Sequence, residues 1–328
     1  MRATFFLPGE NDLARLRRLD PDRDVAEFAP GERAWILQTY ARLAAAGHPV
    51  DLASAPPRDG VLVFHAKHAE RLLRHWWRWG ECLLVAVRAD HSESHLADFE
   101  VLQNRVWEDG QRRFFVPFWP QPGLRPRDPA RGTRVERVAF KGFASNLDPA
   151  FTAPAFANAL RERGLELVVD AVEYGGAATD TSKLRWADYS DVDLVVAVRP
   201  PIGRHTDKPA SKLYNSWRAG LPALLGPEPA FRELRTDPLD YIEVRSVEDT
   251  LAAIDRLRAD PSLYRRMVER GRERAVEFSP EAVLEQWVDL LWRRIPELSA
   301  DRPWLSVPPW IRPALRKAER LLEGRPAR

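Results

Sequence analysis

The sequence predicts an α/β protein in which two Rossmann-like domains face an interdomain cleft. Two stretches of the chain each alternate short apolar runs with helical patterns, which is typical of parallel βαβ units. A proline-rich segment separates these stretches, and its proline density is incompatible with a helix or a central strand. The length of 328 residues suits two domains of ordinary size.

The first domain is expected over residues 1–118. Its apolar runs predict strands, and its amphipathic segments predict helices that end at Gly47 and Gly80. The expected strands are 2–7, 50–54, 60–66 and 82–90, and the expected helices are 31–47 and 67–80.

The segment 114–134 contains five prolines and two glycines, and we place the linker within it at 119–134. The second domain is expected over 135–279, and helices within 280–328 are expected to cross back to the first domain. The expected strands are 135–142, 165–174, 193–198, 222–226 and 241–246; helices are expected at 149–163, from about Ser211, and at 247–258, 261–277 and 280–294.

Composition restricts the class of protein. The 50 basic and 48 acidic side chains nearly cancel, so a nucleic-acid partner is not expected. A single cysteine, Cys82, excludes an internal disulfide framework and suits a reducing compartment. The N-terminal apolar run is too short for a signal peptide, and no run is long enough for a membrane span, which predicts a cytoplasmic protein.

A loop that leads into a helix gathers basic and hydroxyl residues. A helix N-terminus offers backbone N–H donors and the positive end of the helix dipole, so a diphosphate would find donors and cations there. The alternative is an ordinary helix start, capped by Ser211 and surrounded by surface lysines. The residues concerned are Arg204, His205, Asp207, Lys208, Ser211 and Lys212.

The segment 207–234, "DKPASKLYNSWRAGLPALLGPEPAFREL", resembles the donor site of GT-B glycosyltransferases, in particular the glycosyltransferase-4-like C-terminal domain. In that family two glutamates separated by seven residues precede a Gly-x-Pro turn. Here "AGLP" at 219–222 supplies the turn, while Asp207 and Asn215 occupy the glutamate positions. The resemblance implies that Asn215 binds ribose and Asp207 binds the donor sugar. Both side chains differ from the family's, although both can accept hydrogen bonds.

The resemblance covers roughly 135–295 and is only architectural over 1–115. It implies that "VAFKGF" at 138–143 brings the backbone of Gly142 close to the donor phosphate. The implied activity is a hexosyltransferase-like transfer from a nucleotide-sugar to a saccharide or lipid-linked hydroxyl, in glycan or glycoconjugate synthesis. The motif class resembles retaining enzymes. No cofactor and no metal are expected, because basic groups and a helix dipole stabilise the leaving diphosphate.

Asp90 and His91 follow a predicted strand of the first domain and are the candidates for steering or deprotonating the acceptor. His65 and Lys67 follow another strand end in the same way; for each, the alternative is an exposed polar loop. The triplet Asp191-Val-Asp193 matches a metal-binding pattern of another glycosyltransferase fold, but its place before an apolar run favours a turn.

Two other functions remain open from the sequence. One is a sugar-nucleotide epimerase or hydrolase of the same fold, and the other is a degenerate transferase that serves as a nucleotide-binding or scaffolding subunit. The tail 301–328 has seven basic and three acidic residues, together with Trp304 and Trp310. It is a candidate for peripheral membrane contact, with packing on the first domain as the alternative.

Overall fold

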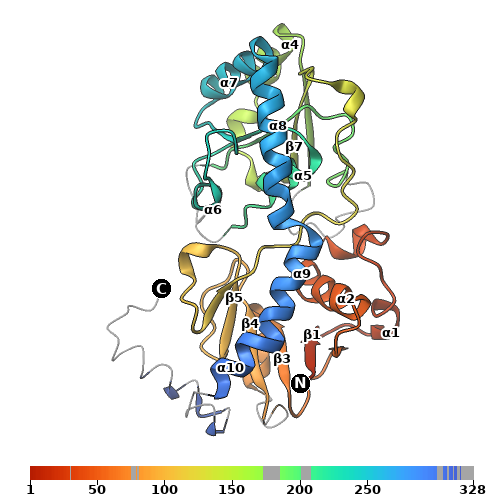
Figure 1. Ribbon diagram of the computed structural model, residues 1–328, viewed down its shortest axis with the longest axis vertical. Coiled ribbons are helices and arrows are strands. Elements are labelled where there is room, and N and C mark those ends of the chain that lie inside the picture. Colours follow the sequence, from red (N-terminus) through yellow and green to blue (C-terminus); the bar gives the residue numbers. More distant parts are fainter. Residues whose placement is uncertain are drawn as a thin grey trace. The chain divides into compact units, whose positions relative to one another are not determined.

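The computed structural model of the chain divides into two compact units, each built around a parallel β-sheet (Figure 1). The first unit comprises Met1–Phe118 and Glu281–Arg328 together with Lys208 and Pro209, and the second comprises Trp119–Thr206 and Ala210–Pro280. The structure describes residues 1–29, 31–74, 79, 81–172, 185–200 and 208–300, and, near the C-terminus, 306–308, 310–312, 314–315 and 318.

The sheet of the first unit has the strand order β2-β1-β3-β4-β5-β6, and its neighbouring strands pair in parallel. Strands β3 and β4 are apolar except for His65 at the end of β3, as is typical of strands in a parallel sheet that is covered on both faces. The bounds are β1 (Ala3–Phe6), β2 (Val50–Ala53), β3 (Val61–His65), β4 (Leu83–Val87), β5 (Phe99–Leu102) and β6 (Arg113–Phe115).

Two of these strands, β5 and β6, were not expected from the sequence. Each is short, and β5 carries Glu100, which is fully buried and accepts a hydrogen bond from the Ser94 N–H at 2.5 Å. A charged residue inside a short run interrupts the apolar pattern that predicts a strand. These two strands are identified only by their pairing in the sheet, where β5 pairs with β4 and β6 pairs with β5.

The helices of the first unit include pieces of the segments expected at 31–47, 67–80 and 280–294. The expected helix at 67–80 begins as a 3-10 turn followed by α3, and residues 75–78 and 80 lie outside the described part. The bounds are α1 (Leu13–Leu16), η1 (Val25–Phe28), η2 (Arg33–Leu37), α2 (Gln38–Ala45), η3 (Ala66–His68), α3 (Ala69–Leu73), η5 (Arg105–Trp107), α9 (Pro280–Asp289), η11 (Leu290–Arg294) and α10 (Ile295–Ala300).

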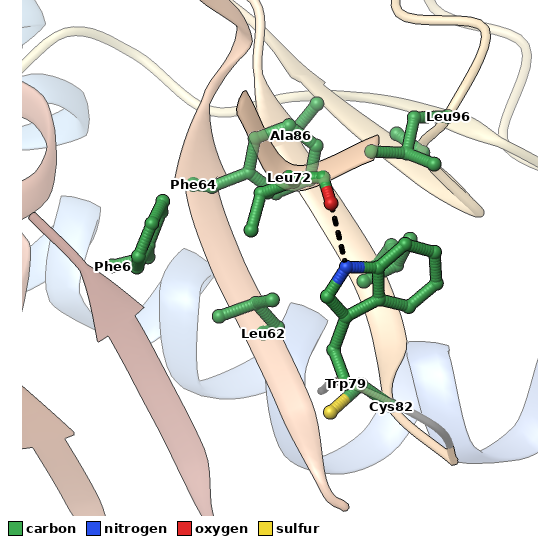
Figure 2. Close-up of a cluster of buried hydrophobic side chains, with 10 residues drawn as sticks. Phe6, Leu62, Phe64, Leu72, Trp79, Cys82, Ala86 and Leu96 are labelled. Atoms are coloured by element: carbon green, nitrogen blue, oxygen red, sulfur yellow. Dashed lines mark hydrogen bonds between the residues drawn. The ribbon is translucent and has the colours of Figure 1, made fainter. Parts of the chain in front are cut away.

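The core of the first unit contains side chains from strands and from the C-terminal helices. Trp287 of α9 packs edge-on against Phe5 with ring centroids 6.3 Å apart. Trp79 is fully buried, as expected for a core aromatic, and its indole N–H donates to the carbonyl oxygen of Leu72 at 2.9 Å (Figure 2). This bond satisfies the one polar atom that the ring brings into an apolar cluster.

The sheet of the second unit has the order β11-β10-β9-β7-β8, again with parallel pairs. Its strands correspond to the five that the sequence predicts for this domain. The bounds are β7 (Arg137–Phe143), β8 (Glu166–Val172), β9 (Leu194–Ala197), β10 (Ala223–Leu225) and β11 (Ile242–Glu243); the helices are η6 (Pro129–Arg131), η7 (Ala144–Asn146), η8 (Pro149–Phe151), α4 (Pro154–Glu162), α5 (Ser211–Ala219), α6 (Pro229–Leu234), α7 (Val247–Ala259), α8 (Pro261–Ala275) and η10 (Val276–Phe278).

Helix α5 packs along α8 (Figure 1). The two helices approach closely because Gly271 faces Trp217, where an added Cβ would lie 2.9 Å from the indole Cδ1. Tyr214 stacks on Phe278 with ring centroids 5.2 Å apart. Gly220 ends α5 in the left-handed conformation, with φ of 73°, which glycine adopts without strain. These contacts fix the helix that the sequence assigns to the donor site.

Asp193 anchors the proline-rich segment to the second unit. Its side chain is fully buried and accepts hydrogen bonds from the guanidinium groups of Arg127 and Arg131 and from the N–H groups of Glu136 and Arg137, at 2.8–3.1 Å. Burial acts to raise the pKa of Asp193, but these hydrogen bonds outweigh it and hold that pKa below its usual value. Asp193 therefore serves as a structural anchor.

Candidate functional site

Polar side chains gather at the carboxyl edge of the first sheet, where parallel α/β folds bind ligands. The strand order places the topological switch point between β1 and β3. His65 ends β3, Asp90 and His91 follow β4, and Gln103 follows β5. The two candidate catalytic residues therefore belong to a polar group that spans three neighbouring strand ends.

His65 is buried, and its ring lies 5.1 Å from that of His91, nearly perpendicular to it. Its Nδ1 accepts a hydrogen bond from the N–H of Lys67 at 3.4 Å. Burial, followed by the nearby positive charges of His91 and Lys67, lowers the pKa of His65 to about 4. The His65 imidazole is consequently neutral near pH 7, with Nδ1 as an acceptor.

Asp90 is held at both carboxylate oxygens. One oxygen accepts from Nε2 of Gln103 at 2.7 Å, and the other pairs with the ammonium group of Lys208, which groups with the first unit. The preceding Ala89 has a φ of 48°, and it is the only non-glycine residue with positive φ among those the structure describes. Such strain persists where the surroundings impose it, often at functional sites. The structure thus brings a predicted catalytic residue, Asp90, to a predicted donor-binding residue, Lys208.

A second polar group at this edge links the loop after β3 to the start of η2. Glu32 pairs with Lys67 and with Nε2 of His68, the latter at 2.5 Å. Burial acts to raise the pKa of Glu32, yet the hydrogen bonds from His68 and Lys67 hold it below its usual value. Glu32 was not identified from the sequence, because it lies far along the chain from its partners Lys67 and His68.

At the carboxyl edge of the second sheet, Gly142 and Lys212 lie in contact. Gly142 belongs to the end of β7, beside the switch point between β7 and β9, and has a φ of 149°. An added Cβ at this position would lie 3.0 Å from Nζ of Lys212, so a larger residue would displace the ammonium group. The same Nζ lies 5.2 Å from the ring centroid of Phe140. Two donor-binding candidates from distant parts of the sequence therefore meet.

The start of α5 differs from the expected capping by one residue. Ala210 is the N-cap, because its carbonyl oxygen accepts the first helical hydrogen bonds from Leu213 and Tyr214. Ser211 is instead the first residue of the helix, and the structure shows no side-chain cap on α5 within the described residues. Because Ala210 has no polar side-chain atom, the first N–H groups of the helix depend on other acceptors.

Asn215 is buried on α5, and its side-chain oxygen accepts a hydrogen bond from the N–H of Gln121 at 3.0 Å. This contact ties the predicted linker to the helix. An amide oxygen has two lone pairs, so the bond to Gln121 occupies one of its two acceptor positions. The other candidates in the donor loop, Arg204, His205 and Asp207, lie outside the described residues.

A buried ion pair at the same edge was not predicted from the sequence. Arg199 follows β9 and donates from Nε to Oε2 of Glu228, which follows β10, at 2.7 Å; both side chains are less than a tenth exposed. Arg199 also donates to the side-chain oxygen of Asn146, which follows β7. The three residues lie in the loops after three neighbouring strands. Each of these residues lies just beyond a predicted strand end, which is a signal that the sequence contains. Their pairing could not be predicted, because the three residues are far apart in the sequence.

The comparisons with known proteins identify the fold. No family model matches the chain, and no curated protein matches it either. Among solved structures, sucrose-phosphate synthase from Thermosynechococcus elongatus is 13% identical, covers 92% of this chain and all of its own, and has a TM-score of 0.57. HepE from Anabaena, in complex with UDP and glucose, is 12% identical over 89% of this chain and 99% of its own, with a TM-score of 0.53.

The chain has the GT-B fold. TarM from S. aureus, in a complex that contains UDP, is a further structure similar to this chain. It is 10% identical, the match covers 71% of this chain and 55% of TarM, and the TM-score is 0.51. The GT-B fold that the resemblance implied for this chain is thereby confirmed, and its two parallel sheets are the α/β architecture that the periodicity predicted.

Among the described residues, no helix combines the length and the hydrophobicity that a membrane-spanning segment requires. No group of three or more His, Cys, Asp or Glu side chains there could hold a metal ion. In the tail, Arg312 is buried and pairs with Asp98 at 3.2 Å, which anchors that part of the tail to the first unit.

Proposed function

We propose that this protein is a glycosyltransferase that moves a sugar from a nucleotide-sugar donor to an acceptor hydroxyl. The contact between Lys212 and Gly142, at the switch point of a GT-B sheet, is the observation that carries this proposal. A glycine that leaves room for an ammonium group beside a helix N-terminus is suited to a diphosphate.

The second unit would hold the donor. Lys212 and the first N–H groups of α5 would offset the charge that grows on the leaving diphosphate, without requiring a metal ion. Asn215 would bind the ribose through the second acceptor position of its amide oxygen. Arg204, His205, Asp207 and Ser211 remain proposed donor-binding residues, on the basis of their place before and at the start of α5.

The first unit would bind the acceptor. Asp90 or His91 would steer or deprotonate the acceptor hydroxyl, and the neutral imidazole of His65 supports His91 from the side. Lys208 would link the two roles, since it pairs with Asp90 and precedes the donor helix. The acceptor is a saccharide or a lipid-linked glycan; Trp310 and Leu315, both exposed in the basic tail, favour peripheral membrane contact for the lipid-linked case.

Titration calorimetry with UDP, GDP, CMP and TDP tests the donor class, and UDP is the first choice because HepE is described with UDP and with UDP-glucose. Lys212→Ala should weaken nucleotide diphosphates far more than nucleosides, by about 1.5–3 kcal/mol, because one charge-assisted hydrogen bond is lost. Arg256→Ala, which removes an exposed charge from α7, is the matched control. Equal losses for UDP and uridine would exclude a phosphate role for Lys212.

A protein that binds the nucleotide but transfers no sugar to any acceptor would instead be the degenerate nucleotide-binding subunit. The occupied oxygen of Asn215 is the observation that favours this second function.

A further inference from the structure

Glu228 has one carboxylate oxygen paired and one unpaired. Arg199 donates to Oε2 at 2.7 Å, whereas Oε1 is buried and has no hydrogen-bond partner in the described structure. The whole Glu228 residue is 5% exposed. A buried acceptor without a partner costs free energy that a bound donor group would recover, so this atom indicates a ligand contact.

The position of Glu228 agrees with such a contact. Its loop follows β10, and the Arg199 to which it is bound follows β9, which flanks the switch point of the sheet. The ends of β7 and β10 are two strand spacings apart, roughly 10 Å. A nucleotide-sugar whose diphosphate lies at Gly142 and Lys212 is long enough to reach Glu228 with one of its hydroxyl groups.

The surrounding contacts keep the carboxylate in place. Arg199 is held on its other side by Asn146, and the N–H of Asp148 donates to the carbonyl oxygen of Val198 at 2.7 Å. The carboxylate is therefore oriented before any ligand arrives, and binding would not have to order it.

We propose that Oε1 of Glu228 accepts a hydrogen bond from a hydroxyl group of the donor substrate. The inference rests on the proposed function and adds a residue that the sequence motif did not include. The hydroxyl belongs either to the ribose or to the transferred sugar, since both offer the same O–H donor.

The test compares Glu228→Gln with the wild-type protein by calorimetry, using UDP, 2′-deoxy-UDP and UDP-glucose. The variant keeps an acceptor for Arg199 but replaces the charged oxygen with an amide, which should weaken the affected ligand about five- to tenfold. A loss for UDP but not for 2′-deoxy-UDP assigns the ribose; a loss for UDP-glucose alone assigns the sugar.

Glu243→Gln is the matched control, because Glu243 ends β11 and both of its oxygens accept from Arg232, at 2.6 and 2.8 Å. Thermal unfolding of each variant shows whether it is folded, so that a loss of affinity from misfolding can be told from the loss of a contact with the ligand. If Glu228→Gln is unfolded, the double variant Arg199→Met with Glu228→Met removes the pair without leaving a lone buried charge.

Three results would overturn the inference. Wild-type affinity of folded Glu228→Gln for all three ligands, with Lys212→Ala still weakened, would reject the role of Glu228 and leave the proposed function standing. If the folded double variant Arg199→Met with Glu228→Met binds all three ligands with wild-type affinity, the role of Glu228 is likewise rejected and the proposed function stands. Failure of the wild-type protein to bind UDP, GDP, CMP or TDP would reject both the proposed function and this inference.

Discussion

At the carboxyl edge of the first sheet, the polar side chains are groups that exchange protons, namely His65, His91, Asp90 and Glu32. At the same edge of the second sheet, they are the fixed charges of Lys212 and of the pair formed by Arg199 and Glu228. The two sheets share a parallel topology with a switch point beside the first strand. Topology therefore decides where polar groups gather, and side-chain chemistry decides what each edge can do.

The comparison suggests a division of work. Imidazole and carboxylate side chains are the groups that most often carry protons to and from an acceptor hydroxyl. Fixed positive charge beside a glycine suits a diphosphate whose negative charge grows as it leaves. Three variants test this division of work between the two edges.

The largest effect is expected at the opposite, amino-terminal edge of the second sheet. Asp193→Ala leaves Arg127 and Arg131 without their shared carboxylate, and breaking a buried charge pair costs about 3–5 kcal/mol of unfolding free energy. Urea unfolding measures the loss. Nucleotide affinity at a temperature where the variant is folded should remain at the wild-type value, and a large loss there would mean that donor binding is not confined to the carboxyl edge.

The next effect concerns protons at the first edge. The folded pKa of His65 is about 4, below the value near 6.5 of the unfolded chain. Between these values the unfolded state binds more protons, so stability is lost as pH falls from about 6.5 to 4, by roughly 3 kcal/mol at most. His65→Asn keeps an acceptor for the Lys67 N–H but cannot titrate.

Unfolding experiments on both proteins at pH 7 and at steps down to pH 4 should show a smaller loss for His65→Asn. Identical pH profiles for the two proteins would show that His65 is not held neutral, and the first edge would lose its distinctive proton chemistry.

The smallest effect is expected for Asn215→Ala. Removing the acceptor of the Gln121 N–H should lower the free energy of unfolding by about 1 kcal/mol. If Asn215 also binds ribose, the dissociation constant of the donor should rise about tenfold or more. Asn215→Asp, which keeps an acceptor oxygen, is the control. Unchanged donor affinity in the alanine variant would assign Asn215 to the linker alone.

The sequence predicted most of the second unit because β7, β8, α7 and α8 are long and periodic, and because β9 and β10 lie in uninterrupted apolar runs. Strands β7 to β11 and helices α4, α5, α7 and α8 follow the expected order, whereas the short helix α6 was not predicted. Gly220 ends α5 at the turn that the motif marked. Local signals of this kind, such as alternation, apolar runs and turn glycines, act over a few residues and are legible in the chain itself. The first sheet was predicted less completely, because β5 carries a buried glutamate and β6 runs into the proline-rich segment that begins at residue 114.

The sequence alone thus predicts the α/β class, the alternation of strands and helices, the strand ends on which Asp90 and His91 lie, and the basic helix start with Lys212. Which of these side chains come into contact depends on the tertiary structure. In the folded chain Lys212 contacts Gly142, and Asn215 accepts a hydrogen bond from Gln121. Arg199 pairs with Glu228, which lies 29 residues further along the chain. These contacts are long-range because a parallel sheet assembles its carboxyl edge from strands that are distant in the sequence. The free energy of a buried pair or an unpaired oxygen depends on that assembly, and no local pattern encodes it.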